Sequence, residues 1–87
     1  MNRVQARDAI LRVLTDVAPD VDPSVVDPAE SFREQFELDS IDHLNFVVGL
    51  TRAFGFEIPE KDYPRLETLE GCLDYLYDRR NTSAPSV

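Results

Sequence analysis

Residues 36–59 read FELDSIDHLNFVVGLTRAFGFEIP, and they are the most informative part of the chain for predicting its fold. A helix is predicted to begin at Asp39 or Ser40, because either side chain can cap the first free amides. The helix should end at Phe54, since Gly55 readily takes the left-handed conformation that terminates helices. Its apolar residues form two stripes, and a short chain can hardly surround such a helix completely. One stripe is therefore expected to face a partner.

The two stripes differ in their expected environment. The first is expected in the core and consists of Phe46, Val47, Leu50 and Phe54. The second follows the spacing i, i+3 and i+7, is expected to be partly exposed, and consists of Ile41, Leu44 and Val48. A core position remains the alternative for Leu44 and Ile41. A narrow polar strip on the same helix contains Asn45, Gly49 and Arg52.

The chain before this helix divides into an amphipathic helix and a long loop. Residues 2–17 are predicted to be helical because their apolar residues share one arc, and these residues are Ala6, Ala9, Ile10, Val13, Leu14 and Val17. Residues 19–39 contain three prolines and six acidic residues before Leu38, which argues against regular structure over most of their length. Three apolar residues are expected to pin this loop across the core, namely Phe32, Phe36 and Leu38.

The chain after Gly55 is predicted to be helical in two pieces. One short helical turn is expected within residues 60–66, which Pro64 interrupts. Thr68 can cap a last helix over residues 69–79, whose apolar residues share one face.

These segments predict an all-α fold, a small four-helix bundle of three main helices plus one short helix, with a long loop between the first and second helices. A length of 87 residues allows a single domain. We expect the domain to span residues 1–80. Residues 81–87 are small and polar and are expected to form a disordered tail.

The composition limits the partners. The chain carries 17 acidic and 9 basic side chains, a formal net charge of -8. Such a surface disfavours nucleic acid and anionic lipid and favours cationic protein partners, although a charge excess can also serve solubility alone. No apolar run is long enough for membrane insertion, and the first residues interleave charges unlike a secretory signal, so a cytoplasmic location is expected. One cysteine and one histidine allow no disulfide framework and too few ligands for a zinc site.

Ser40 is the candidate for chemistry. A serine at a predicted helix start is most often a cap. This serine, however, follows a long loop and opens a helix with an apolar stripe to spare, in the middle of a small acidic chain. Its surroundings therefore indicate more than capping.

The stretch quoted above resembles the signature of the acyl carrier proteins. In that family a D-S-L or D-S-I triplet begins the second helix, as Asp39-Ser40-Ile41 does here, and an F-G-x-x-I-P-like turn ends it. The resemblance extends in outline over residues 4–79. It implies that Ser40 Oγ takes up 4'-phosphopantetheine from coenzyme A through a separate phosphopantetheinyl transferase. The terminal thiol of this arm then carries an acyl or aminoacyl group as a thioester.

The resemblance also implies which residues serve the cofactor and the partner enzymes. Asp39 and Ile41 flank the attachment serine and count as cofactor-binding residues. The expected partner contacts are Asp39, Ile41, Asp42, Leu44, Val48 and Arg52. The partners would be the transferase, an acyl- or aminoacyl-loading ligase, and a downstream transferase or synthase, while the carrier is expected to be a monomer and no enzyme. A helix N-terminus suits the role, since its positive end and free amides favour a phosphodiester.

One departure from the family pattern concerns the charge of the second helix. Where fatty-acid carriers usually have glutamates, this chain has Asn45, Thr51 and Arg52. Acidity is thereby reduced to Asp39 and Asp42, which predicts a specialised carrier instead of one that serves an ordinary fatty-acid synthase. Lipid modification, aminoacyl or D-alanyl transfer, and polyketide or nonribosomal peptide pathways stay open, although L-D-S-I instead of G-G-x-S argues against a peptidyl carrier. The core stripe of the helix could line a pocket for the cargo.

Two other function classes are compatible with parts of the sequence. In an unmodified acidic interaction module, Ser40 would only cap the helix. A small hydrolase would pair Ser40 with His43, but the chain has no G-x-S-x-G elbow, and residues three apart on a helix rarely reach triad geometry. His43 is therefore expected to be a solvated or rim residue and Cys72 an inert buried thiol, and no catalytic or metal-binding residue is assigned.

Overall fold

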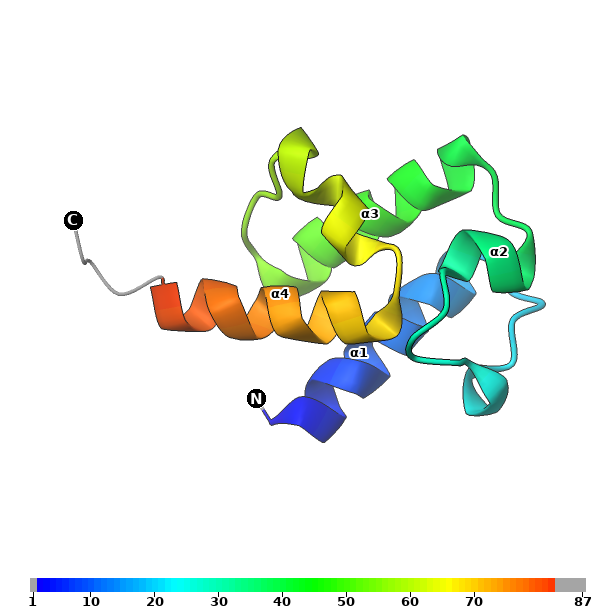
Figure 1. Ribbon diagram of the computed structural model, residues 1–87, viewed down its shortest axis with the longest axis horizontal. Helices are drawn as coiled ribbons and strands as arrows, with labels where there is room; N and C mark the ends of the chain where they lie inside the picture. Colours follow the sequence, from blue (N-terminus) through cyan, green and yellow to red (C-terminus); the bar gives the residue numbers. More distant parts are fainter. Residues whose placement is uncertain (1, 83–87) are drawn as a thin grey trace.

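The computed structural model describes residues 2–82, with side chains described as far as Asp78, and this range is helical without any strand (Figure 1). Along the chain the elements are α1 (Arg3–Val17), η1 (Pro23–Val25), α2 (Phe32–Phe36), α3 (Ser40–Phe54), η2 (Glu60–Leu66) and α4 (Leu69–Thr82), where η marks a 3-10 helix. The predicted all-α class, the three long helices and the short helical turn at residues 60–66 are confirmed. None of the helices in this range is long and apolar enough to cross a bilayer.

α1 begins with a capping box. The Asn2 side chain accepts the Gln5 N–H at 2.8 Å, and the Gln5 side chain accepts the Asn2 N–H at 3.1 Å. This reciprocal pairing satisfies two amides that the first turn would otherwise leave without partners. The buried side of α1 consists of Ala6, Ile10, Leu11, Val13 and Leu14.

The connection between α1 and α3 is more regular than the sequence predicted. Besides η1 it contains α2, whose first turn is capped because Ser31 Oγ accepts the N–H groups of Arg33 and Glu34. The prediction of one long loop was therefore wrong for Phe32–Phe36, since the three prolines of the connection all lie before this segment. A serine followed three residues later by a glutamate is the local signal that indicates this helix start.

The core holds this connection in place. Phe32 is fully buried and packs edge-on against Phe46 of α3, with ring centroids 5.2 Å apart. The Phe32 N–H donates to the Glu67 carbonyl oxygen at 2.7 Å. A second bond, from the Glu70 N–H to the Pro28 carbonyl oxygen, measures 3.0 Å. Together these contacts tie the first connection to the start of α4, as its apolar residues predicted.

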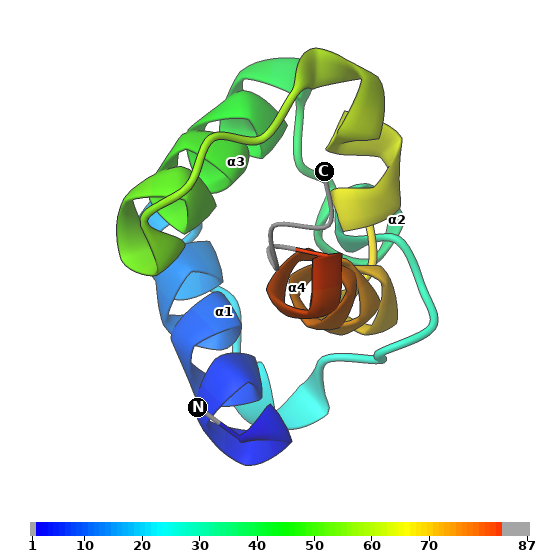
Figure 2. The same ribbon diagram turned by 90° about the vertical axis from the view of Figure 1, so that its left-hand side faces the viewer.

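α3 lies along α1 on one side of the molecule (Figure 2). Gly49 lies at the contact between the two helices, where an added Cβ would come within 2.5 Å of Val13 Cγ1. Its assignment to a polar strip was wrong, because Gly49 is a packing residue that lets the helices approach closely. α3 ends as predicted at Gly55, whose φ of 76° is the left-handed conformation. The deeply buried side of α3, at 2 % exposure or less, consists of Phe46, Val47 and Leu50.

α4 lies between α1 and η2, and Figure 2 shows it end-on in the middle of the molecule. The Tyr75 hydroxyl donates to the Asp62 carboxylate at 2.8 Å, which joins α4 to η2. The helix continues to Thr82, past the predicted end near residue 79, and so includes the first two residues of the expected tail. The rest of that segment, residues 83–87, lies outside the described residues.

Candidate functional site

Asp39, not Ser40, caps α3. The Asp39 carboxylate accepts the Asp42 N–H at 2.8 Å, and Asp39 has the extended backbone of an N-cap residue. Ser40 is the first residue within the helix. The view in which Ser40 serves only as the cap is therefore wrong, and its hydroxyl is left for another role.

The Ser40 side chain is exposed at the start of α3. Arg33 Nη2 donates a long hydrogen bond of 3.4 Å to Ser40 Oγ. An exposed hydroxyl in this place is accessible to a modifying enzyme. The amides of the first turn and the positive end of the helix dipole favour an anionic group there. The residues at this point thus fit a phosphate ester on Ser40.

Arg33 reaches Ser40 because only residues 37–39 separate α2 from α3. Glu37 turns the chain with a left-handed φ of 54°, which is uncommon for a residue with a side chain. The Leu38 N–H then donates to the Arg33 carbonyl oxygen at 3.2 Å. Arg33 was not predicted from the sequence, because its contact depends on this turn and no local pattern marks it.

The second apolar stripe of α3 lies on the surface in the same half of the helix. The exposed fractions are 68 % for Ile41, 48 % for Leu44 and 42 % for Val48. The prediction of partial exposure is confirmed, and the alternative that Leu44 and Ile41 are core residues is wrong. Large apolar side chains on successive turns form a surface suited to a protein partner.

The charged residues of α3 lie at its two ends. Asp39 is exposed and Asp42 is half-buried at the start, whereas Arg52 is exposed in the last turn. A cation in the last turn also suits the negative end of the helix dipole. The Thr51 hydroxyl donates to the Val47 carbonyl oxygen at 3.1 Å, so its polar group is used within the helix. The negative charge of α3 is therefore concentrated at the end that bears Ser40.

His43 is buried, so the prediction of a solvated or rim residue was wrong. Its side chain lies near Phe46, with ring centroids 6.3 Å apart, and its Nδ1 has no hydrogen-bond partner among the described residues. Burial lowers the pKa of His43, and the Arg33 charge lowers it further, while the Glu67 carboxylate raises it. A buried imidazole gives Ser40 no accessible base, which argues against a hydrolase.

Cys72 is a buried thiol, as predicted. Its side chain is fully buried in α4, and its Sγ donates to the Leu66 carbonyl oxygen at 3.5 Å. Burial raises the pKa of the Cys72 thiol far above its ordinary value. The reactive thiolate is therefore disfavoured.

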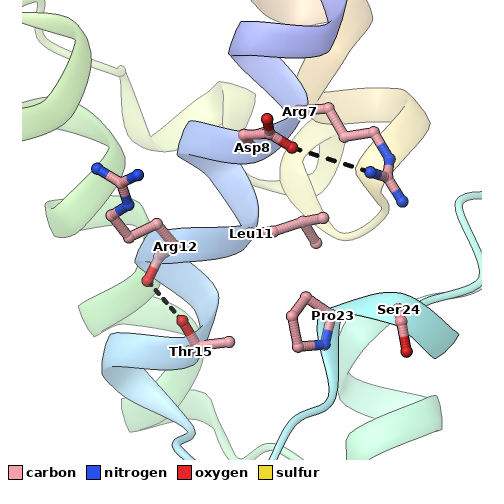
Figure 3. A pocket seen from close by; sticks show the side chains of 7 residues that line it. All are labelled: Arg7, Asp8, Leu11, Arg12, Thr15, Pro23 and Ser24. Carbon is pink, nitrogen blue, oxygen red and sulfur yellow. Dashed lines mark hydrogen bonds and ion pairs between the residues drawn. The ribbon is translucent and has the colours of Figure 1, made fainter.

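A pocket lies between α1 and η1, with a volume of about 590 Å³ (Figure 3). Its lining residues are Arg7, Asp8, Leu11, Arg12, Thr15, Pro23 and Ser24. Figure 3 shows the Arg7 guanidinium directed toward Asp8, and these two side chains form an ion pair of 4.0 Å. None of the lining residues belongs to α3. This pocket therefore does not support the prediction that the core stripe of α3 lines a cargo pocket.

Known proteins resemble this chain over a range that includes most of the helical bundle and Ser40. The family described as "Phosphopantetheine attachment site" matches residues 8–76, a range that contains all of α3. An acyl carrier protein of Rubrobacter xylanophilus is 36 % identical over 77 residues, which cover 85 % of this chain and 95 % of that protein. An acyl carrier protein of Thermosynechococcus vestitus is 30 % identical over 79 residues, covering 91 % and 96 %. Acyl carrier protein 2, mitochondrial, of Arabidopsis thaliana is 30 % identical, covering 87 % and 60 %.

Proposed function

The chain belongs to the phosphopantetheine-binding family of acyl carrier proteins, and on this premise we propose that Ser40 is its attachment residue. The protein is an acyl carrier that serves other enzymes and is not itself an enzyme. Its covalent 4'-phosphopantetheine arm supplies a terminal thiol that holds the acyl group as a thioester. The residues of this chain then have two tasks, because one must accept the arm and others must guide the partner enzymes.

One observation carries the assignment: the Ser40 hydroxyl is exposed at a helix start and does not cap that helix. The other two serines among the described residues have local structural roles. Ser31 caps α2, and the Ser24 hydroxyl donates to the Asp22 carboxylate at 2.7 Å. Ser40 is therefore the described serine whose hydroxyl is most available for transfer.

Intact-mass measurement tests this assignment. Wild-type protein incubated with coenzyme A and a promiscuous phosphopantetheinyl transferase should gain the mass of one arm. Ser40→Ala should gain none, because the oxygen that forms the bond to phosphorus is missing. Ser24→Ala should gain the arm as the wild type does, and it is the matched control. An arm on the Ser40→Ala variant, or none on the wild type, would contradict the assignment.

We infer that partner enzymes dock on the N-terminal half of α3. This docking face consists of Asp39, Ile41, Asp42, Leu44 and Val48. Its exposed apolar residues and the acidic end of the helix support the inference. Charges of this kind mainly accelerate encounter, whereas apolar contacts mainly govern residence time.

The family implies a phosphopantetheinyl transferase and acyl-transferring synthases as partners. We propose in addition an acyl- or aminoacyl-loading ligase as the specific loading enzyme, and a monomeric carrier whose domain spans residues 1–80. The matched range, residues 8–76, falls within that span. The cytoplasm stays a proposal as well, because the relatives include a mitochondrial carrier.

We also propose that this carrier serves a specialised pathway. Its support is the exposed Arg52 at the far end of α3, together with Asn45 and Thr51 where fatty-acid carriers usually have glutamates. A cation here repels basic partner surfaces that an acidic strip would attract. Partners of an ordinary fatty-acid synthase should therefore recognise the chain poorly.

A further inference from the structure

Arg33 has no carboxylate within ion-pairing distance among the described residues, although the chain contains 17 acidic residues. Three arginines in this range do form such pairs, for example Arg65 with Asp78 at 2.6 Å, whereas Arg12 and Arg52, like Arg33, form none. The Arg33 guanidinium is instead directed at Ser40 Oγ, across 3.4 Å. A neutral hydroxyl is a weak partner for a guanidinium, which binds anions much more strongly.

Modification of Ser40 changes the charge at this point. Ser40 Oγ forms a bond to the phosphorus next to the pantetheine, the pyrophosphate bond of coenzyme A breaks, and adenosine 3',5'-bisphosphate and the hydroxyl proton are released. The resulting phosphodiester carries one negative charge. Asp39 and Asp42 lie one and two residues away, so their charges oppose the new anion. A cation beside Ser40 offsets this repulsion, and a guanidinium can bind phosphate oxygens through two parallel N–H donors.

We propose that Arg33 is a positioning residue that binds the phosphodiester on Ser40 and so fixes the base of the arm. The proposal rests on the assignment of Ser40 as the attachment residue. The long bond to a neutral oxygen is exchanged for a charge-assisted bond to a phosphate oxygen. The first bonds of the arm are thereby directed toward α2, while its distal part stays free to reach partner sites.

The backbone of Arg33 is already anchored for this role. Its N–H donates to Ser31 Oγ at 3.1 Å, and its carbonyl oxygen accepts the Leu38 N–H at 3.2 Å. The preceding residue, Phe32, is fully buried. Because the backbone is fixed before modification, only the half-buried side chain has to be ordered when the phosphate is bound.

A thermal-unfolding cycle tests the proposal with four samples: wild type and Arg33→Gln, each without the arm and with it. Intact mass first establishes that the modified samples carry one arm. Arg33→Gln should then lower Tm more in the modified protein than in the unmodified one, by roughly 2–5 °C at low salt. The extra loss should shrink in 1 M salt, because ions screen an exposed charge pair. Subtracting the unmodified pair removes any purely structural effect of the substitution.

Two further variants sharpen the cycle. Arg33→Lys retains the cation but not the paired donors, and should recover part of the extra loss. Arg7→Gln removes the same charge from α1. It should change Tm equally with and without the arm, since Arg7 pairs with Asp8 on α1 and Arg33 is the arginine that contacts Ser40. A wild-type measurement guards against variants that fail to fold: the NMR signal of Arg33 Nε–H should shift when the arm is attached.

The outcomes separate the two proposals. An equal loss of Tm in both states of Arg33→Gln would overturn the role of Arg33 and leave Ser40 as the attachment residue. An unchanged Arg33 Nε–H signal would overturn it too. If the wild type gains no arm, the assignment of Ser40 fails, and the role of Arg33 fails with it.

Discussion

The two faces of α3 are built from similar apolar residues but lie in opposite environments. The core face, Phe46, Val47 and Leu50, is at most 2 % exposed. The apolar residues of the docking face are Ile41, Leu44 and Val48, and they are between 42 % and 68 % exposed. What lies opposite each face makes the difference, because α1 and the buried Phe32 pack against the core face, whereas the described residues leave the docking face open.

With the docking proposed above, α3 has two roles that can be separated by mutation. Burial of the core face stabilises the domain, since each fully buried large apolar side chain contributes roughly 1.5–3 kcal/mol. The docking face gives up that contribution while the protein is free, and it can recover part of it when a partner covers the same residues. Substitutions on the core face should change stability, and substitutions on the docking face should change rates of partner binding.

Leu50→Ala should have the largest effect on stability. It removes most of a side chain that is 2 % exposed and leaves a cavity, at a cost of roughly 2–5 kcal/mol. That is a large part of the stability of a small domain. Urea denaturation followed by circular dichroism measures the loss.

Val48→Ala is the matched control for Leu50→Ala, because both residues are aliphatic and lie on α3. Its effect should stay within about 0.5 kcal/mol, as expected for a surface position. Equal losses in the two variants would mean that the two faces do not differ in burial.

Gly49→Ala tests the contact between α3 and α1. In an open helix this change would stabilise by roughly 1 kcal/mol, because alanine is the better helix former. Here the new Cβ would approach Val13 Cγ1 within 2.5 Å, and a valine side chain in a helix has little freedom to turn away. Overpacking costs roughly 1–3 kcal/mol, so the net effect should be a loss of about 1 kcal/mol.

A double-mutant cycle with Val13→Ala supplies the control for Gly49→Ala. With the valine methyl groups removed, the alanine at position 49 should no longer destabilise and should instead be neutral or stabilising. If Gly49→Ala stabilises the protein even with Val13 present, α3 and α1 do not approach each other as closely at Gly49 as described.

Val48→Asp should leave stability nearly unchanged and speed the dissociation of the phosphopantetheinyl transferase roughly tenfold, a change of about 1.4 kcal/mol in binding. The reason is that a charge replaces an apolar contact of the docking face, and a charge buried there without a partner is unfavourable. Stopped-flow measurement of the dissociation rate tests this expectation. Val25→Asp is the control, since Val25 is 67 % exposed but lies outside α3. The transferase should dissociate from this variant as fast as from the wild type.

Arg52→Glu should have the smallest effect and tests the specialised pathway. It restores an acidic residue where fatty-acid carriers usually have one, so the transfer rate with an acyltransferase of a bacterial fatty-acid synthase should rise a few-fold. Recognition by the cognate loading enzyme should fall. Indifference of both enzymes would remove the main support for a specialised carrier.

Elements that depend on neighbouring residues could be predicted from the amino-acid sequence. The periodic apolar residues of α1, α3 and α4 predicted their helices, and Gly55 predicted the end of α3. The Asp39-Ser40-Ile41 triplet together with the F-G-x-x-I-P-like turn predicted the family, and the triplet marked the candidate attachment residue. The two stripes of α3 were separable by their spacing alone, because residues three, four and seven apart share one face of a helix.

What lies opposite each side chain could not be predicted without the packing of the helices. His43 falls in helical register with Phe46 and Leu50, but its polarity predicted the surface, and only packing shows that it is buried. Gly49 gives no sequence signal for the contact with Val13 on another helix. Arg33 comes beside Ser40 through a left-handed turn at Glu37 that the local sequence does not require. Such contacts depend on how distant segments meet in space, and helical periodicity describes only one segment at a time.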